Sequence, residues 1–101
     1  MDARQFQFEW DDVKAAANVR KHAVSFELAS TIFRDPRLVT LADLEHSDTE
    51  ERWFSLGCSA TGALLAVVYL WSEAGPGTTT IRVISARNAT RNEARYYQEG
   101  L

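Results

Sequence analysis

The chain begins with a two-residue repeat of apolar positions and then changes to a helical one. Aromatic and polar side chains alternate over residues 5–10, which predicts a half-buried strand. Asp11 can accept hydrogen bonds from exposed amides, so a helix is expected to begin after it and to end at Lys21 or His22. The stripe predicted for this helix consists of Val13, Ala16 and Ala17, with Arg20 as a further candidate at helical spacing.

The next stretch predicts a second helix, a strand and an acidic loop. Ser25 is a candidate cap, and the helix after it is expected to end near Phe33 because Asp35-Pro36 disfavours helical geometry. Residues 37–42 are then expected to form a strand, and residues 43–50 a polar loop.

The second half of the chain is dominated by apolar strands. Residues 51–58 and 63–71 predict two strands joined by a short hairpin turn. The second of them is apolar on both faces, which favours a central position in a sheet. Residues 79–86 predict another strand, with Arg82 and Ile84 facing away from Ile81 and Val83.

The last helix is marked at both of its ends. Thr90 and Glu93 have the spacing of a reciprocal capping box, and Gly100 suits the C-terminal end after about Gln98. The order of elements predicts an α+β fold. It would have two N-terminal helices, a C-terminal helix and a small antiparallel sheet of about four strands plus the N-terminal strand. Residues 1–101 are expected to form one domain.

Composition narrows the class of protein. The chain has 101 residues, 46% of them hydrophobic, and its longest apolar run, residues 63–71, is too short to cross a bilayer. Its single cysteine, Cys58, excludes an internal disulfide, is expected to be a small core residue, and suits a cytoplasmic protein. A zinc site is rejected because His22, His46 and Cys58 are widely spaced. No metal, cofactor or membrane is expected.

Basic residues are unevenly distributed in a chain of net charge −3. Residues 43–52 carry five acidic groups and one arginine, whereas residues 79–101 carry four arginines and two glutamates. Arginine is favoured where a phosphate or carboxylate is held by two hydrogen bonds, although a solvated helix face would explain the same excess.

The individual candidates each have a structural alternative. Arg82 lies on a mostly apolar strand face and is costly there without an anionic partner, unless its strand is an edge strand. Arg52 starts a strand and could pair with an acid of the loop.

The remaining candidates lie at the predicted ends of helices. Arg87 and Arg91 flank a helix N-terminus, which favours anions, although Arg87 could also bind backbone carbonyls. Lys21-His22 could move protons, or could complement the dipole of the helix that they end. His46 ranks lower.

Several short sequence strings indicate a protein family. Their order and spacing together are more specific than any single string. The strings are Phe8-Glu9-Trp10-Asp11, Lys21-His22, Val24-Ser25-Phe26-Glu27, Phe33 with Asp35-Pro36, Glu50-Glu51-Arg52, Ile81-Arg82-Val83-Ile84-Ser85-Ala86-Arg87 and Ala89-Thr90-Arg91. Together they resemble the BrnT family over about residues 6–99. The resemblance implies a RelE-like fold and a toxin of a type II toxin–antitoxin system. The conserved basic positions of the family fall on Lys21, His22, Arg52, Arg82, Arg87 and Arg91.

The resemblance also implies a reaction and partners. The expected activity is metal-independent RNA cleavage that inhibits translation. Its partner would be a BrnA-type ribbon-helix-helix antitoxin, in a hetero-oligomer for which 2:2 is one option, and operator DNA would be bound only through that antitoxin. The candidate catalytic residues are Lys21, His22, Glu51, Arg52, Arg82 and Arg87, and the candidate RNA-binding residues are Arg91 and Arg95. The alternative is a non-catalytic module that receives an acidic antitoxin helix and acts as a co-repressor.

Two departures from the family pattern affect these expectations. The glycine that usually follows the Lys-His pair is Ala23 here, which would shift that turn. The family often has arginines after the hairpin glycine and after the long central strand, whereas this chain has Ala63 and residues 70–73 without a basic side chain. A phosphate-contacting charge is therefore missing at these places.

Overall fold

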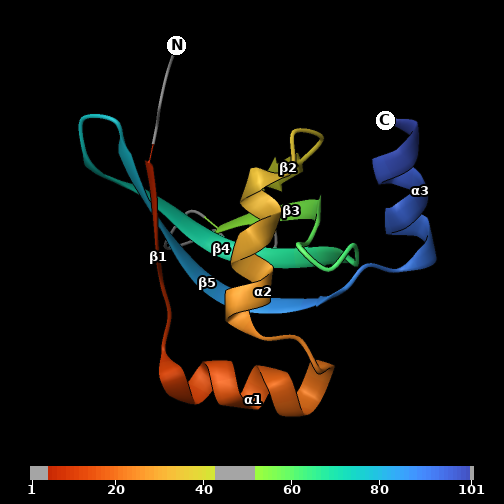
Figure 1. The fold of residues 1–101 in the computed structure, drawn as a ribbon, viewed down its shortest axis with the longest axis horizontal. Helices are drawn as coiled ribbons and strands as arrows, with labels where there is room; N and C mark the ends of the chain where they lie inside the picture. Colours follow the sequence, from red (N-terminus) through yellow and green to blue (C-terminus); the bar gives the residue numbers. More distant parts are fainter. Residues whose placement is uncertain (1–4, 43–51, 101) are drawn as a thin grey trace.

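The α+β fold expected from the sequence is present in the computed structural model, which describes residues 5–42 and 52–100. Figure 1 shows α1 beneath the strands, α2 across the front of them and α3 apart from both. The elements are β1 (Gln5–Glu9), α1 (Asp12–His22), α2 (Phe26–Ser30), the 3₁₀ turn η1 (Thr31–Arg34), β2 (Val39–Ala42), β3 (Arg52–Cys58), β4 (Leu64–Gly75), β5 (Thr78–Asn88) and α3 (Arg91–Glu99).

The strands form one five-stranded sheet in the order β1-β5-β4-β3-β2. β2, β3, β4 and β5 are joined antiparallel, as predicted, and β4 is central. β1 lies at the edge, parallel to β5. The sequence left the direction of β1 open, because no hairpin turn connects β1 to its neighbour.

The boundaries of β4 and of the second helix differ most from the prediction, and strand pairing and side-chain hydrogen bonds explain these two differences. β4 continues past Trp71 because Ser72 and Glu73 still pair with β5, so the gap between the two predicted strands shrinks to a turn at Pro76-Gly77. The second helix changes to a 3₁₀ turn after Ser30. There the Ser30 hydroxyl donates to the Phe26 carbonyl at 2.9 Å and the Thr31 hydroxyl donates to the Leu28 carbonyl at 2.6 Å.

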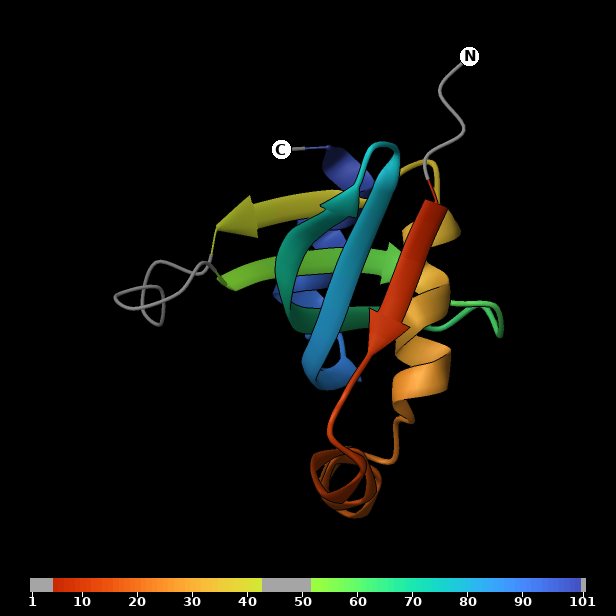
Figure 2. The ribbon, with the colours of Figure 1, turned by 90° about the vertical axis from the view of Figure 1, so that its left-hand side faces the viewer.

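The hydrophobic core lies on one face of the sheet, which we call the helical face. α2 and η1 cover it, and Figure 2 shows α2 along this side of the strands. Its buried side chains are Val24, Phe26, Ala29, Ile32, Leu65, Val67, Tyr69, Ile81, Val83 and Ala86. The burial of these residues is what holds the helices to the sheet.

The predicted apolar stripe of α1 is wrong. Val13 is 77% exposed, Ala16 and Ala17 are exposed, and the buried residue of the helix is Asn18. The Asn18 amide donates to the carbonyls of Val24 and Ala86, both at 2.8 Å, and accepts from the Ala86 amide at 3.1 Å. α1 is therefore attached to the end of β5 mainly by a polar side chain, below the sheet as Figures 1 and 2 show.

Two further expectations about burial are corrected. All five residues of β1 are exposed, because β1 is an edge strand, although Phe6 and Phe8 contact Phe33. Cys58 is exposed at the end of β3 rather than in the core. No helix among the described residues is long and apolar enough to cross a membrane.

Candidate active site

The second face of the sheet, opposite the core, carries three arginines and is called here the arginine face. Arg52 and Arg82 are both paired with Leu70, from its two sides, and Arg87 is paired with Ala66. Leu70 and Ala66 lie on the same face of β4, so the three arginines share that face as well. Strands are spaced by about 4.8 Å, which places the backbones of Arg52 and Arg82 about 10 Å apart.

A β-bulge brings Arg82 and Arg87 to this common face. The two residues are five positions apart, and strict alternation would place them on opposite faces. The register shifts between Val68 and Tyr69, which pair with Ser85 and Val83 and so leave Ile84 as an extra residue in β5. The sequence carried no sign of this bulge.

Arg82 forms an ion pair with the residue beside it on β1. Its Nη1 lies 2.7 Å from Glu9 Oε2, and the two side chains are 42% and 51% exposed. β5 is not an edge strand, because β1 covers it, so the edge-strand explanation of Arg82 is wrong. An exposed single-contact pair of this kind is weak and is screened by salt. Glu9 can therefore be exchanged for another anion at low cost.

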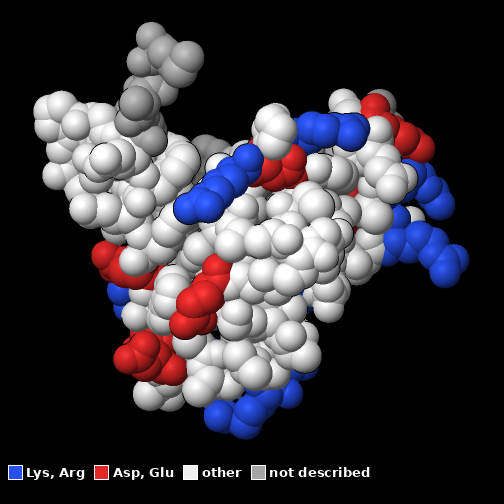
Figure 3. Space-filling view, in the orientation of Figure 1, with Lys and Arg blue, Asp and Glu red and all other residues white. Residues whose placement is uncertain are grey.

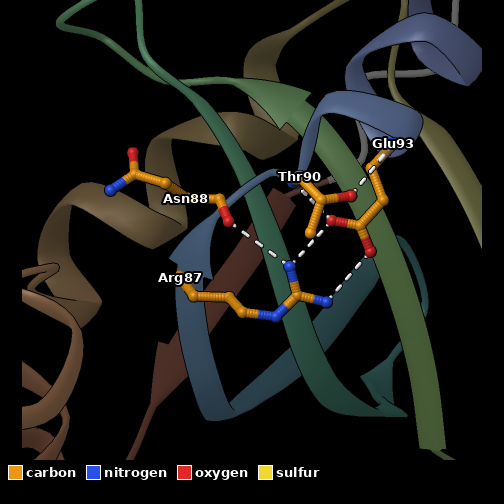
Figure 4. A network of polar contacts seen from close by, with 4 residues as sticks. All are labelled: Arg87, Asn88, Thr90 and Glu93. Carbon is orange, nitrogen blue, oxygen red and sulfur yellow. Dashed lines mark hydrogen bonds and ion pairs between the residues drawn. The ribbon is translucent and has the colours of Figure 1, made fainter.

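Arg87 is held more firmly, by α3. Its Nη1 and Nη2 donate to Glu93 Oε1 and Oε2 at 2.7 and 2.9 Å, and Nη1 also donates to the Asn88 carbonyl at 3.3 Å (Figure 4). The guanidinium carbon lies 6.0 Å from the centre of the Phe54 ring. The hydrogen bonds from Arg87 lower the pKa of Glu93, and those to Glu93 raise the pKa of Arg87. The predicted hydrogen bond from Arg87 to a backbone carbonyl, that of Asn88, is present, but the two bonds to the Glu93 carboxylate are shorter.

The other described candidates lie on helices and not on the arginine face. Lys21 is exposed and His22 half-buried at the end of α1, and neither makes a side-chain hydrogen bond or ion pair within the described part of the chain. Asn18, one turn earlier, binds Ala86, the residue before Arg87. Arg91 and Arg95 are exposed on α3, and Figure 3 shows basic side chains over α3 and over α1. Glu51 and His46 lie outside the described residues.

α3 is anchored at its far end by a second polar cluster. The Tyr97 hydroxyl donates to Asp35 Oδ2 at 2.5 Å, which raises the pKa of Tyr97 to about 12. Asp35 also accepts from the amides of Cys58 and Arg37, and although burial opposes it, these hydrogen bonds keep the pKa of Asp35 below its usual value. The Arg37 guanidinium lies over the Tyr97 ring.

An apolar cavity is found away from all these residues. It has a volume of about 300 Å³ and lies on the helical face. Its lining is formed by Phe33, Leu38, Thr40, Trp53, Tyr69 and Trp71. None of them is a candidate site residue, so the described candidates belong to an open surface and not to this cavity.

Comparison with known proteins shows which family the chain belongs to. A family model described as "Ribonuclease toxin, BrnT, of type II toxin-antitoxin system" matches residues 10–93. The chain belongs to the BrnT family. The resemblance found in the sequence is thereby confirmed, and with it a ribonuclease toxin whose system includes an antitoxin protein.

A solved BrnT structure agrees with the fold. The crystal structure of the Brucella abortus ribonuclease toxin BrnT matches with a TM-score of 0.59 and 19% identity, over 86% of this chain and 99% of that one. At this identity the likeness supports the fold of this BrnT family member and not its individual site residues. No protein of curated function matches the sequence.

Two residues of the candidate site were not singled out for it from the sequence. Glu93 was interpreted only as a helix cap, and Phe54 was included only within the predicted strand of residues 51–58. The capping box was the available signal, because it turns the Glu93 side chain back towards the start of α3 and so towards Arg87.

Proposed function

We propose that the arginine face of this BrnT family member binds the scissile phosphate of RNA and that the chain, as a single domain, cleaves RNA without a metal ion. The observation that carries the proposal is that Arg52, Arg82 and Arg87 share one sheet face, which the bulge in β5 makes possible. Guanidinium groups suit a phosphate because they donate two parallel hydrogen bonds.

The proposed mechanism assigns charge stabilisation to the arginines and proton transfer to their neighbours. RNA carries its own nucleophile, the 2′-hydroxyl, which must be deprotonated while the leaving oxygen is protonated. Arg82 and Arg87 would hold the phosphate, where charge is greatest in the transition state, and Arg52 or Arg91 would assist. Lys21, His22 or Glu51 would move protons, and Arg95 would contact the RNA backbone. The attachment of α1 beside Arg87 through Asn18 supports a role for Lys21 and His22.

The test is RNA cleavage by the purified chain with EDTA present. Cleavage is expected to continue in EDTA and to fall by about 10²–10³ in kcat in Arg82→Ala or Arg87→Ala, the usual loss for one electrostatic contact in a transition state. Lys14→Ala, at the start of α1, is the matched control and should cleave normally. Thermal melting of each variant checks that it is folded. Wild-type activity in both arginine variants, or activity that EDTA abolishes, would contradict the proposal.

The proposed partner is a BrnA-type antitoxin that neutralises the toxin in a hetero-oligomer and carries the operator-binding part. Growth arrest through inhibited translation is the expected effect of the free toxin. Co-expression with a BrnA-type antitoxin should restore growth, and the complex should shift operator DNA that the toxin alone does not shift.

The ion pairs of Arg82 and Arg87 favour one alternative, a non-catalytic antitoxin-binding module. In that case these arginines already have anionic partners and would serve structure or an interface. The module predicts no cleavage under any condition, with antitoxin binding intact.

A further inference from the structure

We infer that Glu93 is a positioning residue for the cleavage reaction: it holds Arg87 so that one edge of the guanidinium stays open for an RNA phosphate. The inference rests on the proposed function. Arg87 already has an anionic partner in Glu93, which argues against phosphate binding if the two compete. The inference is that they do not compete and that the ion pair is part of the site.

The hydrogen-bond pattern of Arg87 supports this role. A guanidinium has five N–H groups. Glu93 takes one from Nη1 and one from Nη2, end-on, and the Asn88 carbonyl takes the second from Nη1. The Nε–H and the second Nη2–H remain. They form the side edge of the guanidinium, and no acceptor among the described residues uses them. Figure 4 shows that Nε lies on the side turned away from Glu93 and Thr90.

That open edge matches a phosphate. The Nε–H and Nη2–H bonds are parallel, and parallel N–H pairs bind two oxygens of a phosphate or carboxylate at once. Arg87 is 38% exposed, so the edge can be reached from solvent. An arginine can therefore hold a carboxylate with its end and a phosphate with its side at the same time.

Glu93 is itself fixed, which a positioning residue must be. Its Oε1 accepts from the Thr90 backbone amide at 2.9 Å, a hydrogen bond that does not use the Thr90 side chain. The Thr90 hydroxyl accepts from the Glu93 backbone amide at 3.1 Å and caps the helix without contacting the carboxylate. The Phe54 ring supports one flat side of the Arg87 guanidinium. With its end clamped and its face supported, Arg87 loses little freedom when phosphate binds, which lowers the barrier to reaction.

The experiment compares Glu93→Gln with Thr90→Ala. Glutamine still caps the helix and keeps one acceptor for Nη1, but it cannot accept from Nη2 and has no charge. Thr90→Ala weakens the cap and leaves the clamp. In single-turnover RNA cleavage, Glu93→Gln is expected to lose roughly 10-fold or more in kcat with KM changed less than about 2-fold, because the arginine acts mainly in the transition state. Thr90→Ala should stay within about 2-fold of wild type in both.

A double variant separates positioning from other roles. If Glu93 acts only through Arg87, then adding Glu93→Gln to Arg87→Ala changes kcat no further. Binding of a 2′-O-methyl RNA, which cannot be cleaved, should be little changed in Glu93→Gln. A merely structural role would instead make Thr90→Ala as damaging as Glu93→Gln and would lower the melting temperature in parallel.

The outcomes also separate this inference from the proposed function. Wild-type kcat in Glu93→Gln, with Arg87→Ala impaired, overturns the positioning role alone. A further loss in the double variant does the same. An unimpaired Arg87→Ala, or a wild type that cleaves no RNA, overturns the phosphate role of Arg87 and the inference with it.

Discussion

At the scale of single residues, Ala23 shows how a departure from the family pattern is absorbed. We expected the missing glycine to shift the turn after Lys21-His22. In the structure Ala23 itself adopts the left-handed conformation, with φ 59° and ψ 29°, and its amide closes α1 onto the Val19 carbonyl. An L-residue with a side chain is strained there, by about 1–2 kcal/mol. This strain lowers the stability of the folded chain.

Ala23→Gly is therefore expected to stabilise the chain by about 1 kcal/mol, because glycine adopts positive φ without the steric penalty. Urea unfolding measures the change. Ala16→Gly, an exposed position inside the same helix, is the matched control and should destabilise by a similar amount. Equal losses in both variants would show that Ala23 carries no strain.

At the scale of elements, α3 differs from the other helices. None of its residues is buried, whereas α2 buries Phe26, Ala29 and Ser30. α3 is held instead by the Glu93–Arg87 pair near its start and by the Tyr97–Asp35 hydrogen bond near its end. The attachment of α3 thus depends on charge and protonation more than on apolar area.

This attachment predicts a dependence of stability on pH. Arg87 lowers the pKa of Glu93 from its usual 4.5 in the folded chain. Glu93 therefore contributes stability that is present above pH 4.5 and lost as the pH falls through its folded pKa. In urea unfolding, wild type is expected to lose about 1 kcal/mol more than Glu93→Gln between neutral pH and the acid side of this range.

The pKa of Asp35 is also lowered in the folded chain, so Asp35 adds the same kind of pH dependence to wild type and to Glu93→Gln. Its contribution therefore cancels when the two stability curves are subtracted. Parallel pH curves for wild type and Glu93→Gln would contradict a stabilising pair.

At the scale of the whole molecule, the two faces of the sheet carry different chemistry. The helical face is buried under α2 and η1, with an aromatic cluster beside it, while the arginine face carries Arg52, Arg82 and Arg87. The chain as a whole is acidic, with net charge −3. RNA binding must therefore come from local arginines and not from a general positive field.

The salt dependence of RNA binding tests this separation. Binding of 2′-O-methyl RNA should weaken linearly with the logarithm of salt concentration, by about 0.7 in slope for each phosphate contact. Arg82→Ala is expected to reduce the slope by one such contact, and Lys14→Ala, on α1, to leave it unchanged. Equal salt-dependence slopes in wild type, Arg82→Ala and Lys14→Ala would show that the RNA does not bind at the arginine face.

The sequence by itself determined the features that depend on neighbours along the chain. Asp11, Ser25 and the Thr90–Glu93 box cap the helices as predicted, because a cap needs only residues two or three positions away. The continuous run of residues 63–71, apolar on both faces, likewise predicted the central strand, and the ordered short strings identified the family.

Only the tertiary structure decided which side chains share the candidate site. Arg82 and Arg87 meet on one face because pairing with β4 forces an extra residue into β5, and a bulge depends on the partner strand rather than on local preference. Asn18 is buried for the same kind of reason, since its partner Ala86 lies 68 positions away. Distant pairing sets these positions, and the local sequence pattern does not record it.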